Sequence, residues 1–309
     1  MIKIAHYFYE EFDRKFFDLL PDNIESIDNS CDSSVDLIYC STIARLSDAF
    51  AAKVKYNKPL ICWVWDIPYN WREWPMTPED EKFAIPLDFP NLITILKNYC
   101  ELVISASKNT QRVLREIFNV ASEQIYFYAD VDLSSVPSIE TKDKSVIQIS
   151  RFTPHKRFEL GIDAVQDIEA SLTCVGKNKN ELYFKKLQAH AKRNVIFLHN
   201  ISRERVITEL TKAAVLIAPT IFEGFGLSPI EAISCGTPIV LNDMPVFREI
   251  YGDAAIYHKQ DDVNDLQQKL MMVLDDVHLQ KKIVKDCKQI IAPFTPKLFV
   301  KRWMKLLFH

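Results

Sequence analysis

The amino-acid sequence predicts an α/β protein built from two doubly wound, Rossmann-like domains. Apolar runs of strand length alternate with helical patterns in both halves of the 309-residue chain, and a polar segment at 134–144 separates the halves. A chain of this length is long for one hydrophobic core and sufficient for two. Doubly wound sheets bind ligands at the carboxyl ends of their strands, so we expect a ligand in the cleft between the domains.

The first half begins with an apolar run at 2–8 and contains a long segment, 66–90, that is rich in tryptophan and proline. A loop of that length inside a compact domain usually serves a function. The strands predicted in this half are 2–8, 35–40, 59–65, 102–105 and 124–128. The helices predicted in this half are 11–20, 43–56, 92–99 and 108–118.

The second half repeats the alternation, and its run at 213–218 has the composition of a strand buried on both faces. The strands predicted in this half are 146–150, 171–175, 195–198, 213–218, 237–241 and 254–257. The helices predicted in this half are 158–165, 181–192, 204–213, one that starts at Ser228, 246–250, 263–274, 279–291 and 297–308.

Composition narrows the class of protein. A net charge of −3 and a pI near 6.2 argue against nucleic acid as the main partner. The seven cysteines are scattered without a Cys-x-x-Cys pair, which favours reduced thiols in a cytoplasmic protein. The first residues lack a basic region followed by an apolar signal core, and no uncharged apolar run is long enough to span a membrane.

The stretch 218–240 joins a buried strand to a helix through the loop Glu223-Gly224-Phe225-Gly226. The chain has only six glycines, none of them in its first 160 residues, yet two lie a single residue apart in this loop. Ser228 suits the N-cap of the following helix. A glycine loop before a helix directs free backbone N–H groups at a phosphate, although a plain tight turn stays open as the alternative.

Two glutamates, Glu223 and Glu231, flank the glycine pair. Glu223 follows a buried strand, where a carboxylate is costly unless it is solvated or binds hydroxyls or cations. We therefore expect Glu223 to contact a ligand. Ser228-Pro-Ile-Glu231 also fits a capping box, so two roles are open for Glu231: capping the helix at the Ser228 N–H, and accepting hydrogen bonds from ligand hydroxyls.

Two cations, Arg151 and Lys156, follow the first strand of the second half. A planar guanidinium and a compact ammonium at the carboxyl end of a strand suit a diphosphate, and a solvated basic loop is the alternative. Each charge-assisted hydrogen bond contributes about 1.5–3 kcal/mol. Two cations and a helix N-terminus therefore supply much of the roughly 8 kcal/mol behind micromolar binding, and we expect neither a metal ion nor a cofactor.

Three segments together resemble the GT-B glycosyltransferases of family 4. They are Arg151-x4-Lys156, Glu223-Gly-Phe-Gly-Leu-Ser-Pro-Ile-Glu231-Ala and Gly236-Thr-Pro-Ile-Val240, and the resemblance is strong over 146–257. The resemblance implies a GT-B fold and transfer of a hexose from a nucleotide diphosphate sugar to a glycan or lipid-linked acceptor. It further implies retention of anomeric configuration without a metal, as in polysaccharide biosynthesis.

The same resemblance assigns roles to the site residues. Arg151 and Lys156 would hold the diphosphate and stabilise the leaving group, with Glu223 beside the donor sugar. The remaining donor-binding residues would be Glu231 at the ribose hydroxyls, with Gly224, Phe225, Gly226 and Leu227 at the sugar or phosphate. Asp132 matches the aspartate that precedes the inter-domain linker, where we expect a structural role.

The first half departs from the family pattern, so acceptor-side residues are harder to assign. Trp65 stands where many members carry histidine. For the next residue, Asp66, two roles are open: it binds acceptor or donor, or it is a turn residue before proline. His6 either faces the cleft or lies in the core. Four tryptophans are candidates to line an acceptor site: Trp63, Trp65, Trp71 and Trp74. For Trp63 and Trp65, packing in the core is the alternative.

We therefore expect domains at 1–138 and 139–292, followed by a C-terminal helix, 293–309, that by resemblance returns to the first domain. The same helix is basic and apolar, so peripheral contact with anionic lipid at the inner face of a membrane is the alternative. Two functions compete with glycosyl transfer: a sugar-nucleotide epimerase or hydrolase, and a catalytically silent partner subunit.

Overall fold

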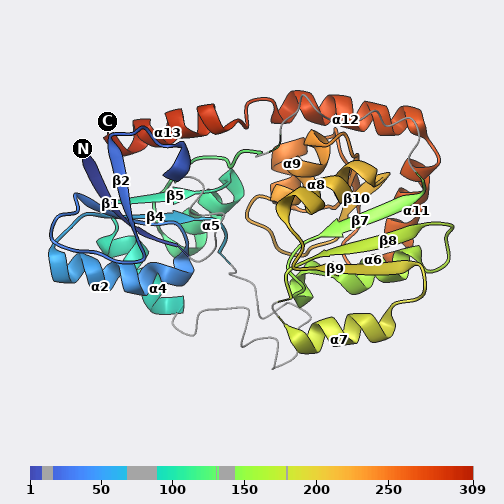
Figure 1. Cartoon of the computed structure of the whole chain (residues 1–309), viewed down its shortest axis with the longest axis horizontal. Coiled ribbons are helices and arrows are strands. Elements are labelled where there is room, and N and C mark those ends of the chain that lie inside the picture. The colour runs from blue at the N-terminus through green and yellow to red at the C-terminus, as the bar shows by residue number, and fades with distance from the viewer. Residues whose placement is uncertain (9–16, 68–88, 130, 132–142, 179, 309) are drawn as a thin grey trace. The chain divides into compact units, whose positions relative to one another are not determined.

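The structure is a computed structural model that describes residues 1–8, 17–67, 89–129, 131, 143–178 and 180–308. These residues form two compact units (Figure 1). The first comprises 1–8, 17–67, 89–128 and 294–308, and the second comprises 129, 131, 143–178 and 180–293. The chain leaves the first unit after Tyr128, and the predicted boundary at residue 138 lies outside the described residues.

The first unit contains a parallel sheet of strand order β2-β1-β3-β4-β5-β6. Its strands are β1 (Ile2–Tyr7), β2 (Ile24–Asp28), β3 (Leu37–Cys40), β4 (Leu60–Val64), β5 (Leu102–Ser105) and β6 (Glu123–Gln124). Its helices are the 3-10 turns η1 (Phe17–Leu19) and η2 (Ile43–Arg45) with α2 (Leu46–Tyr56), α4 (Phe89–Tyr99), α5 (Lys108–Phe118) and α13 (Pro296–Phe308). The central strands β3 and β4 are buried along their whole length, as expected for a parallel sheet covered on both faces.

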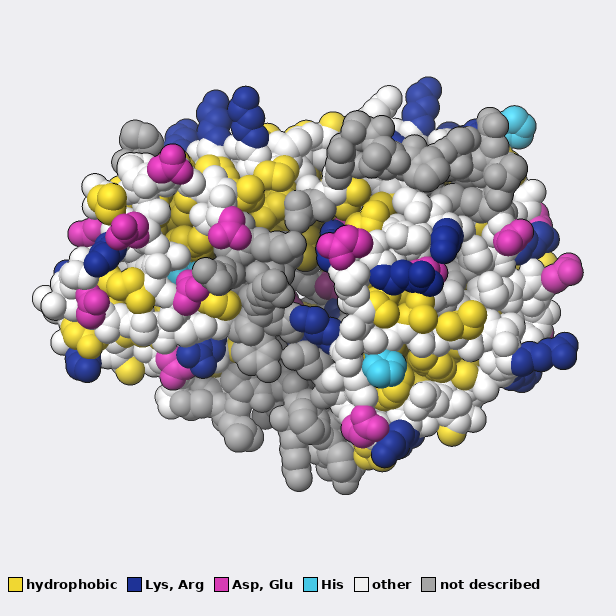
Figure 2. Space-filling view, viewed as in Figure 1, with side chains coloured by type: hydrophobic (Ala, Val, Ile, Leu, Met, Phe, Trp, Pro, Cys, Tyr) yellow, Lys and Arg dark blue, Asp and Glu magenta, His cyan; other side chains and the backbone are white. Residues whose placement is uncertain are grey.

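The last helix, α13, packs on the first unit through two aromatic side chains. Trp303 is fully buried, and its ring lies edge-on to Tyr39 of β3 at 5.4 Å between centroids. The ring centroid of Phe299 lies 5.2 Å from that of Trp63 in β4. The opposite side of α13 is exposed and basic, and Figure 2 shows Lys and Arg side chains along this edge of the first unit. Its exposed cations are Lys297, Lys301, Arg302 and Lys305.

The second unit has a parallel sheet of order β12-β11-β10-β7-β8-β9, in which the chain runs outward from β7 in one direction and from β10 in the other. Its strands are β7 (Ser145–Ile149), β8 (Ser171–Gly176), β9 (Val195–His199), β10 (Val215–Ala218), β11 (Ile239–Asn242) and β12 (Ile256–His258). Its helices are η5 (Pro154–Lys156), α6 (Phe158–Val165), α7 (Glu181–His190), α8 (Arg203–Lys212), α9 (Leu227–Ser234), α10 (Pro245–Tyr251), α11 (Val263–Leu274) and α12 (Val277–Ile291). The helices α6 and α7 cover one face, and α8 and α9 cover the other (Figure 1).

Short polar side chains start many of these helices. Each accepts a hydrogen bond from a backbone N–H of the first turn, which satisfies a donor that the helix itself leaves unpaired. The N-caps of α5, α7, α8, α11 and α12 are Ser107, Asn180, Ser202, Asp262 and Asp276. The boundaries predicted from the sequence for these helices therefore agree with the structure to within a few residues.

Three predicted elements need correction. The strand β2 was not predicted, because this edge strand has two isolated isoleucines among three polar residues and no apolar run. The strand predicted at 124–128 is limited to Glu123–Gln124. Of the helix predicted at 11–20, residues 17–19 form only a 3-10 turn, and 11–16 lie outside the described residues. Among the described helices, none is both long enough and apolar enough to cross a lipid bilayer.

Candidate functional site

The site predicted in the second half forms where the sheet of the second unit reverses its strand order. β7 and β10 are adjacent, and the chain continues from them toward opposite edges of the sheet, which is the point where doubly wound sheets bind ligands at their carboxyl edge. The loop 150–157 follows β7, and the loop 219–226 follows β10. His155 joins the two, since its carbonyl accepts hydrogen bonds from the Ile221 N–H at 3.0 Å and the Thr220 hydroxyl at 3.1 Å.

The structure brings together two of the predicted residues, one from each loop. The Lys156 ammonium lies 2.6 Å from Glu223 Oε1 and 3.4 Å from the Phe222 carbonyl. The Lys156 side chain is only 8% exposed and that of Glu223 is 21% exposed. A cation this deeply buried is stable only with an anionic partner or hydrogen-bond acceptors, and this pairing provides both.

The backbone of Lys156 is fixed by a hydrogen bond from a side chain of the sheet. Gln148, in β7, is 2% exposed and donates a hydrogen bond of 2.8 Å from Nε2 to the Lys156 carbonyl. Gly161, in α6, leaves space for that amide, since a Cβ at this position would lie 2.5 Å from Gln148 Oε1. The position of Lys156 therefore depends on a buried side chain of the sheet.

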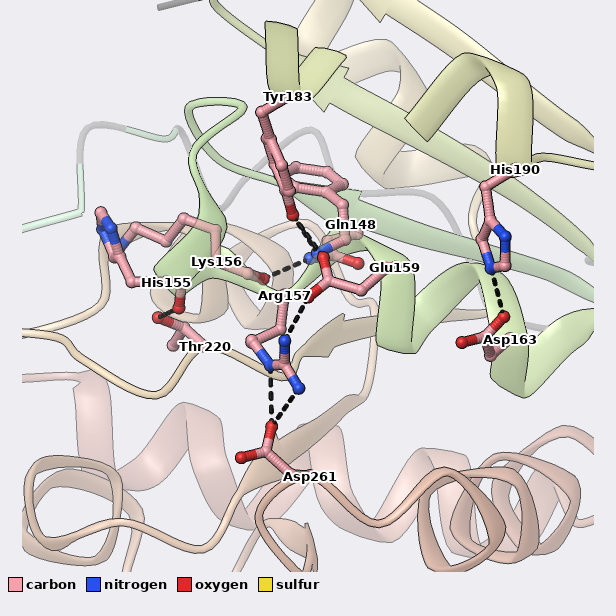
Figure 3. Close-up of polar contacts among 11 residues, drawn as sticks. Gln148, His155, Lys156, Arg157, Glu159, Asp163, Tyr183, His190, Thr220 and Asp261 are labelled. Atoms are coloured by element: carbon pink, nitrogen blue, oxygen red, sulfur yellow. Dashed lines mark hydrogen bonds and ion pairs between the residues drawn. The ribbon is translucent and has the colours of Figure 1, made fainter. Parts of the chain in front are cut away.

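The residue after Lys156 is fixed by a chain of polar contacts (Figure 3). Arg157 has a left-handed backbone with φ of 52°, which is unusual for a residue other than glycine. Its guanidinium binds Asp261 through Nε at 2.7 Å and Nη2 at 2.6 Å, and it also binds Glu159. Glu159 accepts from the Tyr183 hydroxyl, which itself accepts from the Phe158 N–H at 3.2 Å. This network holds the loop behind Lys156 against α7 and the start of α11.

His155 adds a neutral group to this loop. Burial lowers its pKa well below the ordinary value, and the positive charges of Lys156 and Arg151 lower the pKa further. The imidazole is therefore uncharged at neutral pH, and the positive charge of the loop comes from its lysine and arginines.

Arg151 stands apart from the other predicted cation. Its side chain is exposed, and within the described residues its guanidinium has no ion pair or side-chain hydrogen bond. Phe152, the next residue, is fully buried and anchors the loop by donating its N–H to the Lys177 carbonyl at 3.0 Å. The loop at Arg151 is thus fixed through its backbone, while the Arg151 side chain is exposed.

The glycine loop starts α9 in a different way from the one predicted. Gly226 is the N-cap, with φ of +88°, and the helix begins at Leu227. A side chain at 226 would also collide with Phe247, because a Cβ there would lie 2.6 Å from Cε1. The prediction of Ser228 as N-cap is therefore wrong: the left-handed glycine turns the chain into the helix two residues earlier. Gly224 and Phe225 of this loop are buried, and Leu227 is half-buried.

The capping role left open for Glu231 is consequently excluded. Glu231 lies in the middle of α9 with its side chain 11% exposed, and its Oε1 lies 2.7 Å from Nη2 of Arg203, the first residue of α8. Arg203 was not predicted, because nothing in the local sequence pattern pairs these two helices. Arg157 and Gln148 were missed for the same reason, although Arg157 directly follows the predicted Lys156.

The acceptor-side candidates lie in the first unit. His6 is fully buried at the end of β1, 3.1 Å from the Ser41 hydroxyl and stacked on Phe17, which favours the core alternative. Trp65 is half-buried and edge-on to Phe127 at 5.0 Å, and Asp66 beside it is also half-buried. Trp63 is a core residue with 3% exposure. Trp71, Trp74 and Asp132 lie outside the described residues.

The arrangement in the second unit suits an anionic ligand that also carries hydroxyl groups. The exposed Arg151 guanidinium and the Lys156 ammonium, which is paired with Glu223, provide positive charge. The carboxylates of Glu223 and Glu231 provide hydrogen-bond acceptors. Among the described residues, no group of three or more His, Cys, Asp and Glu side chains is placed to hold a metal ion. The site therefore has the donors for phosphate oxygens and the acceptors for sugar hydroxyls.

Known proteins resemble this chain in sequence and in fold. The O-antigen chain mannosyltransferase RfbU of Salmonella typhimurium is 27% identical over 227 residues, which are 69% of this chain and 64% of that protein, so the match covers less than two thirds of its length. The Anabaena protein HepE, solved in complex with UDP and glucose, has a TM-score of 0.80 at 16% identity and covers 99% of both chains. Sucrose-phosphate synthase of Thermosynechococcus elongatus has a TM-score of 0.82 at 15% identity, over 99% of this chain and 98% of that one.

These likenesses confirm the predicted fold class, two parallel α/β sheets in the GT-B architecture. A family model matches residues 132–289, just over half of the chain, and this range contains every strand of the second unit's sheet. That segment contains Arg151, Lys156, Glu223 and Glu231. By this match the chain is a member of the family described as Glycosyl transferases group 1.

Proposed function

We propose that this chain is a retaining glycosyltransferase that moves a hexose from a nucleotide diphosphate sugar to a glycan or lipid-linked acceptor without a metal ion. The observation that carries the proposal is the convergence of Lys156 and Glu223, 2.6 Å apart, at the strand reversal of the second unit. The name of the Salmonella relative and the UDP and glucose in the Anabaena structure support the same class of reaction.

In this proposal the diphosphate binds Arg151, Lys156 and the first backbone N–H groups of α9. The acceptor hydroxyl oxygen bonds to the anomeric carbon while the bond from that carbon to the diphosphate breaks, and the proton of that hydroxyl passes to the leaving diphosphate oxygen. Negative charge grows on the leaving diphosphate, and the two cations stabilise that charge more in the transition state than in the ground state. Because these fixed cations supply the positive charge, the reaction needs no divalent metal.

Glu223 and Glu231 have separate roles in the proposal. Glu223, beside the Lys156 ammonium, accepts hydrogen bonds from hydroxyls of the donor sugar and orients the sugar relative to the diphosphate. Glu231, which lies in α9, accepts hydrogen bonds from the ribose hydroxyls. Gly226 permits the left-handed turn that starts α9 and the close packing of Phe247 against it, since it lacks a Cβ.

The test is a thermal-shift panel of nucleotide sugars, with GDP-mannose and UDP-glucose first, followed by measurement of transfer. A ligand that binds only the folded chain stabilises it by RT ln(1 + L/Kd), where L is the free ligand concentration, and so raises its Tm. We expect one donor to raise the Tm and to support transfer in excess EDTA, with an α-linked product from an α-linked donor by NMR. Donor binding with hydrolysis or epimerisation alone would favour the sugar-nucleotide enzyme, and binding without any turnover the silent subunit.

We also propose that the acceptor is reached at a membrane surface. The exposed cations Lys297, Lys301, Arg302 and Lys305 of α13 support this, since several lysines and arginines on one helix attract anionic lipid. Co-sedimentation with vesicles of phosphatidylglycerol should exceed that with phosphatidylcholine, and replacing the four cations by glutamine should abolish the difference. Equal binding to both vesicles would contradict the membrane contact.

A further inference from the structure

Glu231 is a carboxylate in a largely apolar helix. Its neighbours Ile230 and Ala232 are fully buried, and its own side chain is 11% exposed. An ionised carboxylate at such a position is costly unless a charge or several hydrogen bonds compensate it. The compensating charge that the structure provides is Arg203, whose Nη2 lies 2.7 Å from Glu231 Oε1.

Arg203 is well placed to fix the carboxylate because its own backbone is fixed. It is the first residue of α8, directly after the N-cap Ser202, whose hydroxyl accepts from the Arg205 N–H at 3.3 Å. The helix α8 packs beside α9, and the Arg203 side chain is 35% exposed, so it reaches Glu231 from the solvent side. The contact uses one carboxylate oxygen, and the described residues give Glu231 Oε2 no partner, so that oxygen keeps its acceptor capacity.

We propose that Arg203 is a positioning residue that holds the Glu231 carboxylate toward the ribose hydroxyls and thereby sets a preference for ribonucleotides. This inference rests on the proposed function, in which Glu231 accepts from the ribose. A carboxylate makes a stronger hydrogen bond than a neutral acceptor, and a buried carboxylate keeps a fixed orientation only with its cation in place. Without Arg203 the carboxylate loses its orientation, and the energetic difference between a ribose and a deoxyribose is lost.

The experiment measures dissociation constants by titration calorimetry for GDP and UDP and for their 2′,3′-dideoxy counterparts. The quantity that tests the inference is the ratio of the dideoxy constant to the ribonucleotide constant, for whichever base binds more tightly. We expect a ratio of about tenfold or more in the wild-type chain, the size of one charge-assisted hydrogen bond. In Arg203→Gln the ratio should fall to near one, through weaker ribonucleotide binding and unchanged dideoxynucleotide binding.

Two further variants separate positioning from a general structural role. Arg205→Gln is the matched control, because Arg205 lies on the same helix and pairs with Glu209 at 2.8 Å, and it should keep the wild-type ratio. Arg203→Lys keeps the charge but not the planar guanidinium, so its ratio should be intermediate. If Arg203→Gln is too unstable for binding to be measured, the ratio measured in Arg203→Lys decides the test.

The outcomes are distinguishable. A wild-type ratio retained in Arg203→Gln would overturn the inference, and so would an equal weakening of both ligands, which would make Arg203 a direct contact of the diphosphate or base. A ratio near one in the wild-type chain would overturn the ribose role of Glu231 while leaving glycosyl transfer intact. Failure of the wild-type chain to bind any nucleotide would overturn the proposed function itself.

Discussion

The Lys156 ammonium and the Glu223 carboxylate lie 2.6 Å apart, so each neutralises the other at the point where the loops after β7 and β10 meet. A diphosphate that binds Lys156 has to share this cation with Glu223 or take it away. In the proposed function the two residues are therefore coupled, because binding of the diphosphate frees the carboxylate for a sugar hydroxyl.

Glu223→Gln tests this coupling. We expect transfer to fall by about two to three orders of magnitude, the usual effect of removing one electrostatic contact at a reacting centre. Binding of a nucleoside diphosphate should instead become several-fold tighter, because Lys156 no longer has a competing anion. Without nucleotide the variant should lose about 1–3 kcal/mol of stability, since Lys156 is 8% exposed and loses its partner.

The measurements are transfer rate, calorimetric affinity and the rise in Tm with saturating GDP and UDP. The control is Glu209→Gln, which breaks an ion pair with Arg205 on α8 and should leave the nucleotide-induced rise in Tm unchanged. Weaker nucleotide binding in Glu223→Gln would mean that Glu223 does not compete for Lys156, and the coupling would be wrong.

Lys156→Met tests the contact with the diphosphate. The change removes a charge-assisted contact to phosphate but keeps a long apolar stem, so we expect diphosphate affinity to fall about ten- to hundredfold. Affinity for the bare nucleoside should not change. Lys144→Met is the matched control, since Lys144 pairs with Asp275 at the opposite, amino end of β7 and is half exposed. An equal loss for nucleoside and diphosphate would contradict the assignment of phosphate to Lys156.

The fold was predictable because its central strands are buried on both faces. β10 and β11 consist mostly of apolar residues between breakers such as Pro219 and Gly236, a pattern that is typical of buried parallel strands. β2 was missed because an edge strand needs apolar residues on at most one face, and its sequence, Ile-Glu-Ser-Ile-Asp, has no such run. Local pattern therefore reveals buried strands better than edge strands.

The site was predictable in part, for a related reason. Arg151, Lys156 and Glu223 follow strand ends, and strand ends can be recognised in the sequence. The pairing of Glu231 with Arg203 joins two helices that are 28 positions apart at these residues, and no local rule predicts it. The prediction of a capping box at Ser228 was wrong because Gly226 adopts a left-handed backbone with φ of +88°. The helix therefore begins before Ser228, although serine is a favoured N-cap residue.

Tyr183→Phe tests the network behind Lys156. Burial raises the pKa of Tyr183 far above its usual value, and the adjacent Glu159 carboxylate raises it further, so the hydroxyl stays protonated as a donor. Its loss leaves the Phe158 N–H without a partner and removes one of two contacts of Glu159, which keeps its ion pair with Arg157, and this should cost about 1–3 kcal/mol of stability. If the network positions Lys156, diphosphate affinity should also fall several-fold.

The readouts are denaturant unfolding and calorimetric affinity for GDP and UDP. Tyr99→Phe is the matched control, because Tyr99 is 46% exposed at the end of α4 in the first unit. A loss of stability with unchanged diphosphate affinity would show that the network supports the fold alone and does not position Lys156.

The pH dependence of stability tests the buried state of His155. Burial, and then the charges of Lys156 and Arg151, depress its folded pKa, whereas the unfolded chain has the ordinary value near 6.5. Below about pH 6.5 the unfolded chain takes up a proton that the folded chain does not, so stability falls as pH falls. The contribution is fully present above pH 6.5 and declines by up to about 1.4 kcal/mol per pH unit below it. His258, whose pKa burial also lowers, contributes in the same direction.

Unfolding free energies measured by urea titration from pH 7.5 to 5 should therefore fall less steeply in His155→Gln than in the wild-type chain. Comparing the slopes of the two chains removes the contribution of carboxylates that both share. His278→Gln, at an exposed position of α12, should retain the wild-type slope. A His155→Gln slope identical to that of the wild-type chain would mean that the imidazole takes up its proton over the same pH range in the folded and unfolded chains, and the lowered pKa of His155 would be wrong.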